Sequence, residues 1–330
     1  MAILITGGAG YIGSHTARAL HEQGEEIVVF DSLQTGHRQA VPEGVPFYQG
    51  DLREAGALEP VFENHSISAV VHFAAFSLVG ESVTEPLKYY NNNVHGTECL
   101  LAALRDHGVK AIVFSSTAAT YGEPENIPIL ETDRTLPTNP YGETKLAIEK
   151  MLRWCDRAYG LKSVALRYFN AAGAHKSGEI GEDHRPETHL IPNVLRAALT
   201  GKPVKLFGTD YPTKDGTCVR DYIHVTDLAQ AHILALRHLL GGGDSTVYNL
   251  GSGTGFSVRE IVDAAEAVTG KAVAREYCGR RAGDPATLIA SSEKIRRELG
   301  WKPQFDDIHS IIETAWRFLE SHPNGYGDGE

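Results

Sequence analysis

Tyr141 and Lys145 stand four positions apart and could form a proton-transfer pair. They open an expected helix over 141–159, and residues at this spacing share one helix face. An ammonium beside a phenol stabilises the phenolate, so we expect Lys145 to pull the pKa of Tyr141 from about 10 toward neutral pH. Tyr141 would then serve as a general base. The alternative is an ordinary solvated helix face.

Hydroxyl side chains follow an apolar run that ends at Phe114, and they belong to Ser115, Ser116 and Thr117. The carboxyl ends of parallel strands face the ligand crevice of an open α/β sheet. We select Thr117 as the group that hydrogen-bonds a reacting oxygen. The alternative is that these residues only form a turn.

Residues 6–13 read Thr-Gly-Gly-Ala-Gly-Tyr-Ile-Gly, directly after one apolar run and before an expected helix. Their glycines satisfy both G-x-G-x-x-G and G-x-x-G-x-x-G spacing, through Gly7, Gly8, Gly10 and Gly13. Such a turn lets the backbone approach a pyrophosphate, and the helix N-terminus offers free N–H groups to it. The pattern predicts a dinucleotide site.

Asp31 ends the second apolar run, about 20 residues beyond the glycines, where a carboxylate can bind ribose hydroxyls. Its charge repels a 2′-phosphate, which predicts NAD rather than NADP. Asp51 and Leu52, after the next short strand, could contact the adenine. The alternative for Asp31 is a simple cap of the strand end.

Short apolar runs alternate with amphipathic stretches through the first half of the chain. Nearly unbroken apolar runs are typical of parallel strands buried on both faces, and the alternation predicts a Rossmann-type, doubly wound α/β sheet. Expected strands cover 3–5, 26–30, 69–73, 111–114 and 163–166, and expected helices cover 11–23, 53–64, 94–107 and 141–159.

After residue 170 the sequence becomes rich in Gly, His, Glu and Pro, which suggests entry into a second region. We predict an NAD-binding domain over 1–169, rejoined by segments near 221–255. The remainder, 170–330, would form a smaller mixed α/β domain that binds the substrate. The tail after Ser321 is expected to be loose.

Composition narrows the functional classes. With 42% hydrophobic and 22% charged residues the chain is not disordered, and a net charge of −11 disfavours nucleic-acid and anionic membrane partners. The N-terminus shows no signal-peptide pattern, and the four cysteines lie far apart. We therefore expect a cytoplasmic protein without a disulfide framework.

The histidines His184 and His189, beside Glu182 and Asp183, invite a metal interpretation. Their spacing matches no single helix face, and the surrounding segment is typical of a loop. We therefore predict no metal site.

Beyond single motifs, the chain resembles the extended branch of the short-chain dehydrogenase/reductase superfamily, and within it the family of UDP-glucose 4-epimerases. The resemblance runs from residue 3 to about residue 323. Its most specific stretches are TGGAGYIGSHT (6–16), VGESVTEPLKYYNNNVHGT (79–97), FSSTAATYGE (114–123), PYGETKLAIE (140–149), RYFNAAGAH (167–175), GTDYPTKDGTCVRDYIHVTDLA (208–229) and YNLGSG (248–253).

Residue by residue, the resemblance implies that Tyr141 is the catalytic base, that Lys145 tunes it and holds the nicotinamide ribose, and that Thr117 is catalytic. The implied NAD site comprises Gly7, Gly10, Tyr11, Ile12, Gly13, Asp31, Ser32, Thr35, Gly36, Asp51, Leu52, Phe73, Ala74, Ala75, Ser77, Asn92, Ser115, Tyr141, Lys145 and Phe169. The implied UDP-sugar site comprises Thr117, Tyr141, Asn170, His189, Leu190, Lys205, Phe207, Arg220, Arg281, Asp284 and Leu288.

The resemblance implies a reaction as well. UDP-galactose and UDP-glucose would interconvert in galactose metabolism by reversible transfer of the C4 hydride to tightly bound NAD, through a 4-keto sugar. It also implies a homodimer, formed by a helical bundle from 81–107 and the helix after Tyr141. Guanidinium groups such as Arg220 and Arg281 can grip a diphosphate bidentately.

Two positions depart from the family pattern. Ser77 stands where several relatives carry a lysine near the cofactor, so one NAD contact would differ. Leu288 occupies a position that can hold a tyrosine beside the C2 substituent of the sugar. The smaller side chain leaves room for an N-acetyl group, which predicts some activity on UDP-N-acetylglucosamine and its galacto epimer.

Three alternatives stay open at this point. A nucleotide-sugar 4,6-dehydratase shares the glycine turn and the Tyr–Lys pair, but it needs an acidic pair where this chain has Ala118 and Ala119. A pentose epimerase would act on UDP-xylose. A regulatory NAD sensor would keep the fold without the chemistry, which intact Tyr141, Lys145 and Thr117 disfavour.

Overall fold

A seven-stranded parallel sheet forms the centre of the molecule, and the computed structural model describes it within residues 1–281 and 285–327. The strand order is β11-β6-β5-β4-β1-β2-β3, and every neighbouring pair is parallel. The strands are β1 (Ala2–Thr6), β2 (Ile27–Asp31), β3 (Phe47–Gln49), β4 (Ile67–His72), β5 (Ala111–Ser115), β6 (Lys162–Arg167) and β11 (Thr246–Asn249). The predicted Rossmann-type sheet is confirmed.

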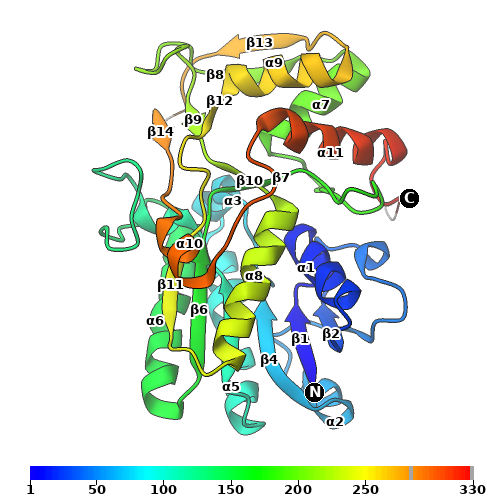
Figure 1. Cartoon of the computed structure of the whole chain (residues 1–330), viewed down its shortest axis with the longest axis vertical. Coiled ribbons are helices and arrows are strands. Elements are labelled where there is room, and N and C mark those ends of the chain that lie inside the picture. Colours follow the sequence, from blue (N-terminus) through cyan, green and yellow to red (C-terminus); the bar gives the residue numbers. More distant parts are fainter. Residues whose placement is uncertain (282–284, 328–330) are drawn as a thin grey trace.

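Helices cover both faces of this sheet (Figure 1). Side chains alternate along a strand, so Ile3 and Ile5 pack with α1 and α8 on one face, whereas Leu4 faces the core beneath α2, α5 and α6. The helices are α1 (Tyr11–Glu22), α2 (Glu59–Asn64), α5 (Gly96–Asp106), α6 (Pro140–Tyr159) and α8 (Val225–Leu240). Two-sided burial explains why the strand sequences are continuously apolar.

Short helical segments lie in the connections between the longer elements. They are η1 (Arg38–Ala40), α3 (Val79–Thr84), α4 (Pro86–Tyr89), the π-helical turn η2 (Tyr90–His95) and η3 (Ala118–Tyr121). The helices α3 and α4 both pack against α6.

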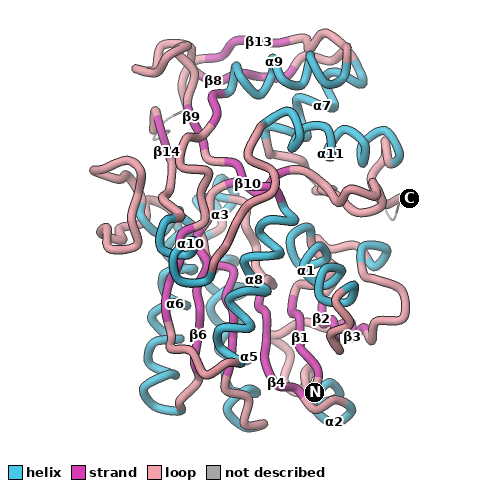
Figure 2. The backbone as a smooth tube through the Cα atoms, viewed as in Figure 1, coloured by secondary structure: helices cyan, strands magenta, loops and turns pink. Residues whose placement is uncertain are grey.

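The C-terminal part builds a second core around α7, α9 and α11, beyond the carboxyl ends of the sheet strands (Figures 1 and 2). Its helices are α7 (Leu190–Thr200), α9 (Val258–Thr269), α10 (Glu293–Leu299) and α11 (Ile308–Ser321). Its strands are β7 (Asn170–Ala172), β8 (Val204–Phe207), β9 (Val219–Arg220), β10 (Tyr222–His224), β12 (Phe256–Ser257), β13 (Arg275–Cys278) and β14 (Thr287–Leu288). The division into two domains at residue 169 stays a prediction.

Two local expectations were wrong. The helix expected over 53–64 begins only at Glu59, because Gly56 takes a φ of 77° and Pro60 occupies the first turn. The tail after α11 is anchored rather than loose as far as it is described, since the Tyr326 amide donates to Asp183 at 3.1 Å.

The strand order reverses direction at β1, which lies between β2 and β4. Crevices outside the carboxyl ends at such a switch point are where open α/β sheets bind ligands. None of the helices within the described ranges combines the length and apolarity of a bilayer span.

Candidate active site

One cavity of about 1520 Å³ opens at this switch point and extends from the glycine turn to β8 and β9. It exceeds the ~300–1,000 Å³ that is usual for one small ligand. Every predicted site residue within the described ranges contributes to its wall, except Gly36. Gly36 instead packs against Ala9, where a Cβ would lie 2.9 Å from the Ala9 carbonyl carbon. The predicted residue Asp284 lies outside the described residues.

The glycine turn leaves no room for side chains. A Cβ on Gly13 would lie 2.1 Å from the Gly7 carbonyl oxygen, and one on Gly7, at φ 74°, would lie 2.4 Å from the Ala74 nitrogen. Close packing of this kind brings the N-terminus of α1 against the cavity. The turn therefore has the shape needed to approach a pyrophosphate.

Asp31 is the last residue of β2, and Asp51 follows the neighbouring strand β3. The Asp31 carboxylate accepts hydrogen bonds from the amides of Ala9 (2.9 Å) and Leu33 (2.8 Å), and burial raises its pKa. Asp31 thus caps the turn and lines the cavity at the same time. Asp51 is paired with Arg53, whose hydrogen bond lowers the pKa of the carboxyl.

Tyr141, Lys145 and Thr117 meet at one wall of the cavity, as the sequence predicts. Tyr141 lies in the first turn of α6, capped by Asn139, whose side chain accepts from the Gly142 amide at 2.9 Å. Thr117 follows β5, and its hydroxyl accepts from the Ala119 amide at 3.1 Å. The three groups offer a proton acceptor, a cation and a hydroxyl in one place.

The expected lowering of the tyrosine pKa is wrong. Burial raises the pKa of Tyr141 to about 12, and a hydrogen bond with Thr117 opposes this only in part. The Lys145 Nζ lies 5.9 Å from the Tyr141 ring centroid and donates to the Ser115 carbonyl at 2.8 Å. Burial lowers the pKa of Lys145 itself to about 7, against the opposing charge of Glu149. Desolvation is thus the largest cause of both pKa shifts.

A buried polar network stands behind this wall. Glu149 accepts from Ser116 Oγ at 2.6 Å and from two nitrogens of Arg167 at 2.9 and 2.5 Å. Arg167 also donates to the Tyr121 hydroxyl at 2.8 Å. The sequence analysis missed this network, although Glu149 stands four residues after Lys145 and so shares its helix face.

At the other end, the predicted substrate residues are brought together by strand pairing. β9 lies between β12 and β14, so Leu288 is the register partner of Arg220. The Arg281 guanidinium lies 3.9 Å from the Phe207 ring centroid. The Asn170 amide donates to the Asp221 carbonyl at 2.9 Å. This end of the cavity therefore carries cationic and aromatic groups.

The sequence analysis also missed how the segment before α7 folds. Glu182, His184, Glu187 and His189 gather there and line the same cavity. Burial alone would lower the histidine pKa values, but contacts with the two glutamates raise the pKa of His184 to about 9 and of His189 to about 10. An extended loop can gather such groups as well as a helix face can.

The fold and this site define a class of protein: a Rossmann-type fold in which one continuous cavity is lined by a glycine-rich turn typical of dinucleotide binding, by Tyr141, Lys145 and Thr117, and by arginines at its other end. The chain belongs to the NAD dependent epimerase/dehydratase family, whose sequence model matches residues 3–251.

Known relatives extend the likeness to the whole chain. It is 59% identical to the UDP-glucose 4-epimerase of Halalkalibacterium halodurans over 99% of this chain and 98% of that one. A crystal structure of a UDP-glucose 4-epimerase superposes with a TM-score of 0.97 at 56% identity, covering 99% of both chains. The UDP-glucose 4-epimerase of Brucella ovis in complex with NAD superposes with a TM-score of 0.93 at 49% identity, covering 96% of this chain and 98% of that one.

The lowered pKa of Lys145 predicts a pH-dependent stability. The folded protein loses this proton near pH 7, whereas the unfolded chain keeps it to about pH 10.4. The unfolded state thus binds more protons between these values, so Lys145 makes the free energy of unfolding rise with pH, by up to about 1.4 kcal/mol per pH unit. Urea unfolding of wild type and Lys145→Met at pH 7 and pH 9 measures this contribution.

The rise should be smaller in Lys145→Met and unchanged in Lys150→Met, because Lys150 is exposed on the same helix. An identical pH slope in wild type and Lys145→Met would contradict the assignment.

Proposed function

We propose that this chain is a nucleotide-sugar 4-epimerase that interconverts UDP-galactose and UDP-glucose with NAD as its cofactor. The observation that carries the proposal is one continuous cavity. It joins the glycine turn, the Tyr141, Lys145 and Thr117 wall, and the end that bears Arg220 and Arg281. Membership of the epimerase/dehydratase family and similarity over the full chain to UDP-glucose 4-epimerases support it.

The residues of the turn fit NAD. The backbone at Gly7, Gly10 and Gly13 would approach the pyrophosphate, since these residues line the cavity and carry no side chain that would stand between the backbone and the ligand. The Asp31 carboxylate would bind the ribose hydroxyls and repel a 2′-phosphate. When bound, NAD supplies the acceptor and later the donor of the C4 hydride, so the sugar passes through a 4-keto form without net oxidation.

The wall of the cavity would perform the proton transfers. Tyr141, as its phenolate, would take the proton of the sugar 4-hydroxyl, and the resulting phenol would return that proton to the sugar oxygen at the end of the reaction. Thr117 holds the same sugar oxygen by a hydrogen bond. Lys145 as an ammonium ion stabilises the phenolate, and its neighbour Glu149 favours that charged form.

The arginine end would anchor the substrate. Arg220 and Arg281 would grip the diphosphate, and the uracil end would bind among Phe207, Leu190 and Lys205, which line the same cavity. Anchoring at the diphosphate leaves the sugar free to turn and present either face of C4. Positioning of the reacting atoms would supply much of the rate.

Elimination of water, as in a dehydratase, finds no support at this wall. The two residues after Thr117 are Ala118, which is buried, and Ala119, which lines the cavity. Neither can donate or accept a proton. The presence of Tyr141, Lys145 and Thr117 on this wall disfavours a role as an NAD sensor that catalyses no reaction.

We also propose that the N-acetylated pair, UDP-N-acetylglucosamine and UDP-N-acetylgalactosamine, is accepted. Leu288 lines the cavity beside Arg220. A leucine there occupies less space than a tyrosine and leaves room for an N-acetyl group at C2. Service in galactose metabolism and a cytoplasmic location remain predictions from the sequence.

A homodimer is a further part of the proposal. Exposed apolar side chains gather on the elements for which the sequence predicts a bundle, with Val83 in α3 61% exposed, Leu87 in α4 80% and Trp154 in α6 64%. The helices α3 and α4 pack against α6. Large exposed apolar side chains on packed neighbouring helices are typical of protein interfaces.

Activity is tested with purified protein, UDP-galactose and no added cofactor, by following the anomeric protons with NMR. We expect conversion toward a mixture with UDP-glucose, driven by retained NAD. Tyr141→Phe should fold and retain NAD but lose at least about 10²-fold in rate, since general acid–base catalysis contributes on that scale.

The control is Tyr159→Phe, an exposed tyrosine at the other end of α6, which should turn over at the wild-type rate. Near-wild-type turnover of Tyr141→Phe would refute the role of Tyr141. No conversion of any UDP-sugar by protein that carries NAD would refute the epimerase function.

Sugar specificity is tested at Leu288. Wild type should convert UDP-N-acetylgalactosamine, and Leu288→Tyr should lower the rate on this sugar, relative to UDP-galactose, by about 10-fold or more. Leu288→Met, with a similar volume, should keep the wild-type ratio. A wild-type enzyme that converts UDP-galactose but leaves UDP-N-acetylgalactosamine unchanged would refute this extension.

Oligomeric state is tested by sedimentation. We expect a particle of about twice the 35.9 kDa chain mass, and Leu87→Asp should shift it toward the monomer. Leu240→Asp changes an exposed leucine at the end of α8 and should leave the mass unchanged. A monomeric wild type at micromolar concentration would contradict the dimer.

A further inference from the structure

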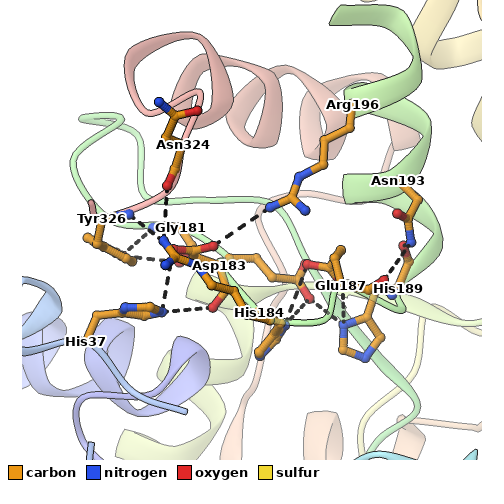
Figure 3. Close-up of polar contacts among 12 residues, drawn as sticks. His37, Gly181, Asp183, His184, Glu187, His189, Asn193, Arg196, Asn324 and Tyr326 are labelled. Atoms are coloured by element: carbon orange, nitrogen blue, oxygen red, sulfur yellow. Dashed lines mark hydrogen bonds and ion pairs between the residues drawn. The ribbon is translucent and has the colours of Figure 1, made fainter. Parts of the chain in front are cut away.

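Four potential metal ligands converge in the segment between β7 and α7, apart from the proposed catalytic wall. They are Glu182, His184, Glu187 and His189, and one ligand atom of each lies within 4.8 Å of all the others. Figure 3 shows His184, Glu187 and His189 turned toward a common point. Two imidazoles and two carboxylates form a donor set that suits a transition metal.

The path of the chain explains this convergence. Asp183 points away from His184: its backbone and side chain contact His37, Arg196 and the Tyr326 amide (Figure 3). Further along the chain, the Glu187 carboxylate accepts from the amide of His189 at 2.8 Å, which turns the segment back on itself.

The spacing of the ligand atoms matches a small coordination sphere. His184 Nδ1 lies 3.2 Å from Glu182 Oε1 and 3.8 Å from Glu187 Oε2. His189 Nδ1 lies 2.5 Å from Glu182 Oε1 and 3.5 Å from Glu187 Oε1. Ligands at about 2.0–2.2 Å from a tetrahedral zinc ion lie about 3.3–3.6 Å from one another. The observed distances fall below, within and above this range, so shifts of under about 1 Å would complete the site.

A second, independent observation concerns hydrogen bonds that are not made. The side chains of Glu182 and Glu187 are only 7% and 2% exposed. Within the described residues, Glu187 Oε2 and His184 Nδ1 are buried and make no hydrogen bond, and their polar contacts are the ion pairs of His184 Nδ1 with Glu182 Oε1 and with Glu187 Oε2. A buried carboxylate oxygen that makes no hydrogen bond is costly, and a metal ion bound between the carboxylates and the imidazoles would replace these ion pairs with coordination bonds.

We propose that Glu182, His184, Glu187 and His189 bind one zinc ion, with both histidines coordinating through Nδ1. Two carboxylates and two neutral imidazoles around Zn²⁺ have no net charge, and metal binding releases the imidazole Nδ1 protons to solvent. The imidazole ligands favour Zn²⁺ over Mg²⁺ and Ca²⁺, which prefer oxygen ligands.

The site is structural, because four protein ligands leave no open position on the metal. His189 is the residue that precedes α7, and the His184 ring lies 6.3 Å from the ring of Tyr11, which lines the cavity at the glycine turn. Zinc would therefore fix the wall that faces the cofactor end. The Nε2 atom of His189 remains available to the substrate.

The experiment uses the full chain, freed of metal with EDTA and dialysed against Zn²⁺ or Co²⁺. We expect one equivalent of metal per chain and, with Co²⁺, the intense visible bands of a tetrahedral site. His184→Gln and Glu187→Gln should each weaken metal binding by at least about 10-fold. Loss of a residue that only hydrogen-bonds a metal ligand already costs about that much, and these two residues are ligands themselves. His309→Gln, which removes an exposed histidine from α11, should bind as wild type does.

Absence of bound metal in the wild type at micromolar Zn²⁺ would overturn the proposal. The cluster would then consist only of ion pairs between protonated histidines and glutamates. Equal binding by wild type, His184→Gln and Glu187→Gln would also overturn it. Weak, octahedral Co²⁺ bands in the wild type would do so even if a variant failed to fold. Each of these results leaves the epimerase proposal untouched, because the catalytic wall contains none of the four residues.

Discussion

The buried ion pair between Glu149 and Arg167 is the interaction on which the catalytic wall depends. Its side chains are 4% and 6% exposed, and their nitrogen and oxygen atoms approach to 2.5 Å. Glu149 belongs to α6, Arg167 ends β6, and Ser116, which donates to Glu149, follows β5. One carboxylate therefore fixes the helix that carries Tyr141 and Lys145 relative to the strand end that carries Thr117. Losing one partner would leave a buried charge uncompensated, at a cost of about 3–5 kcal/mol, so the network holds the wall in one arrangement.

The glycine turn, which lines another part of the cavity, depends on close backbone packing rather than on an ion pair. Gly13 packs against the Gly7 carbonyl and Gly7 against Ala74, which leaves space only for hydrogen atoms. This packing sets α1 directly against β1 and turns its N-terminus toward the cavity. Asp31 strengthens the arrangement, because its carboxylate binds the Ala9 amide within the same turn. The charge that would recognise a ribose is thus also part of the framework of the turn.

The sequence predicts most of the fold because its signals are local and agree with one another. Continuous apolar strands, the glycine spacing and the Tyr–Lys pair each depend on a few neighbouring residues, and the structure confirms the sheet and brings the three catalytic candidates together. The failures involve burial or long-range contacts. The pKa of Tyr141 follows from desolvation, which spacing cannot reveal. The contact of Tyr326 with Asp183 and the gathering of Glu182 with His189 depend on the path of irregular loops.

Burial has a consequence for the chemistry at the wall. It disfavours the charged form of both Tyr141 and Lys145, because it raises the pKa of the first and lowers that of the second. An isolated phenolate or an isolated ammonium ion is therefore costly there, whereas the two charges together compensate each other. Deprotonation of the tyrosine is thus favoured only while the lysine keeps its proton. Glu149 biases the lysine toward that state, although Arg167 neutralises much of its charge. The same carboxylate that fixes the geometry of the wall thereby also favours the protonated lysine on which a phenolate at Tyr141 depends.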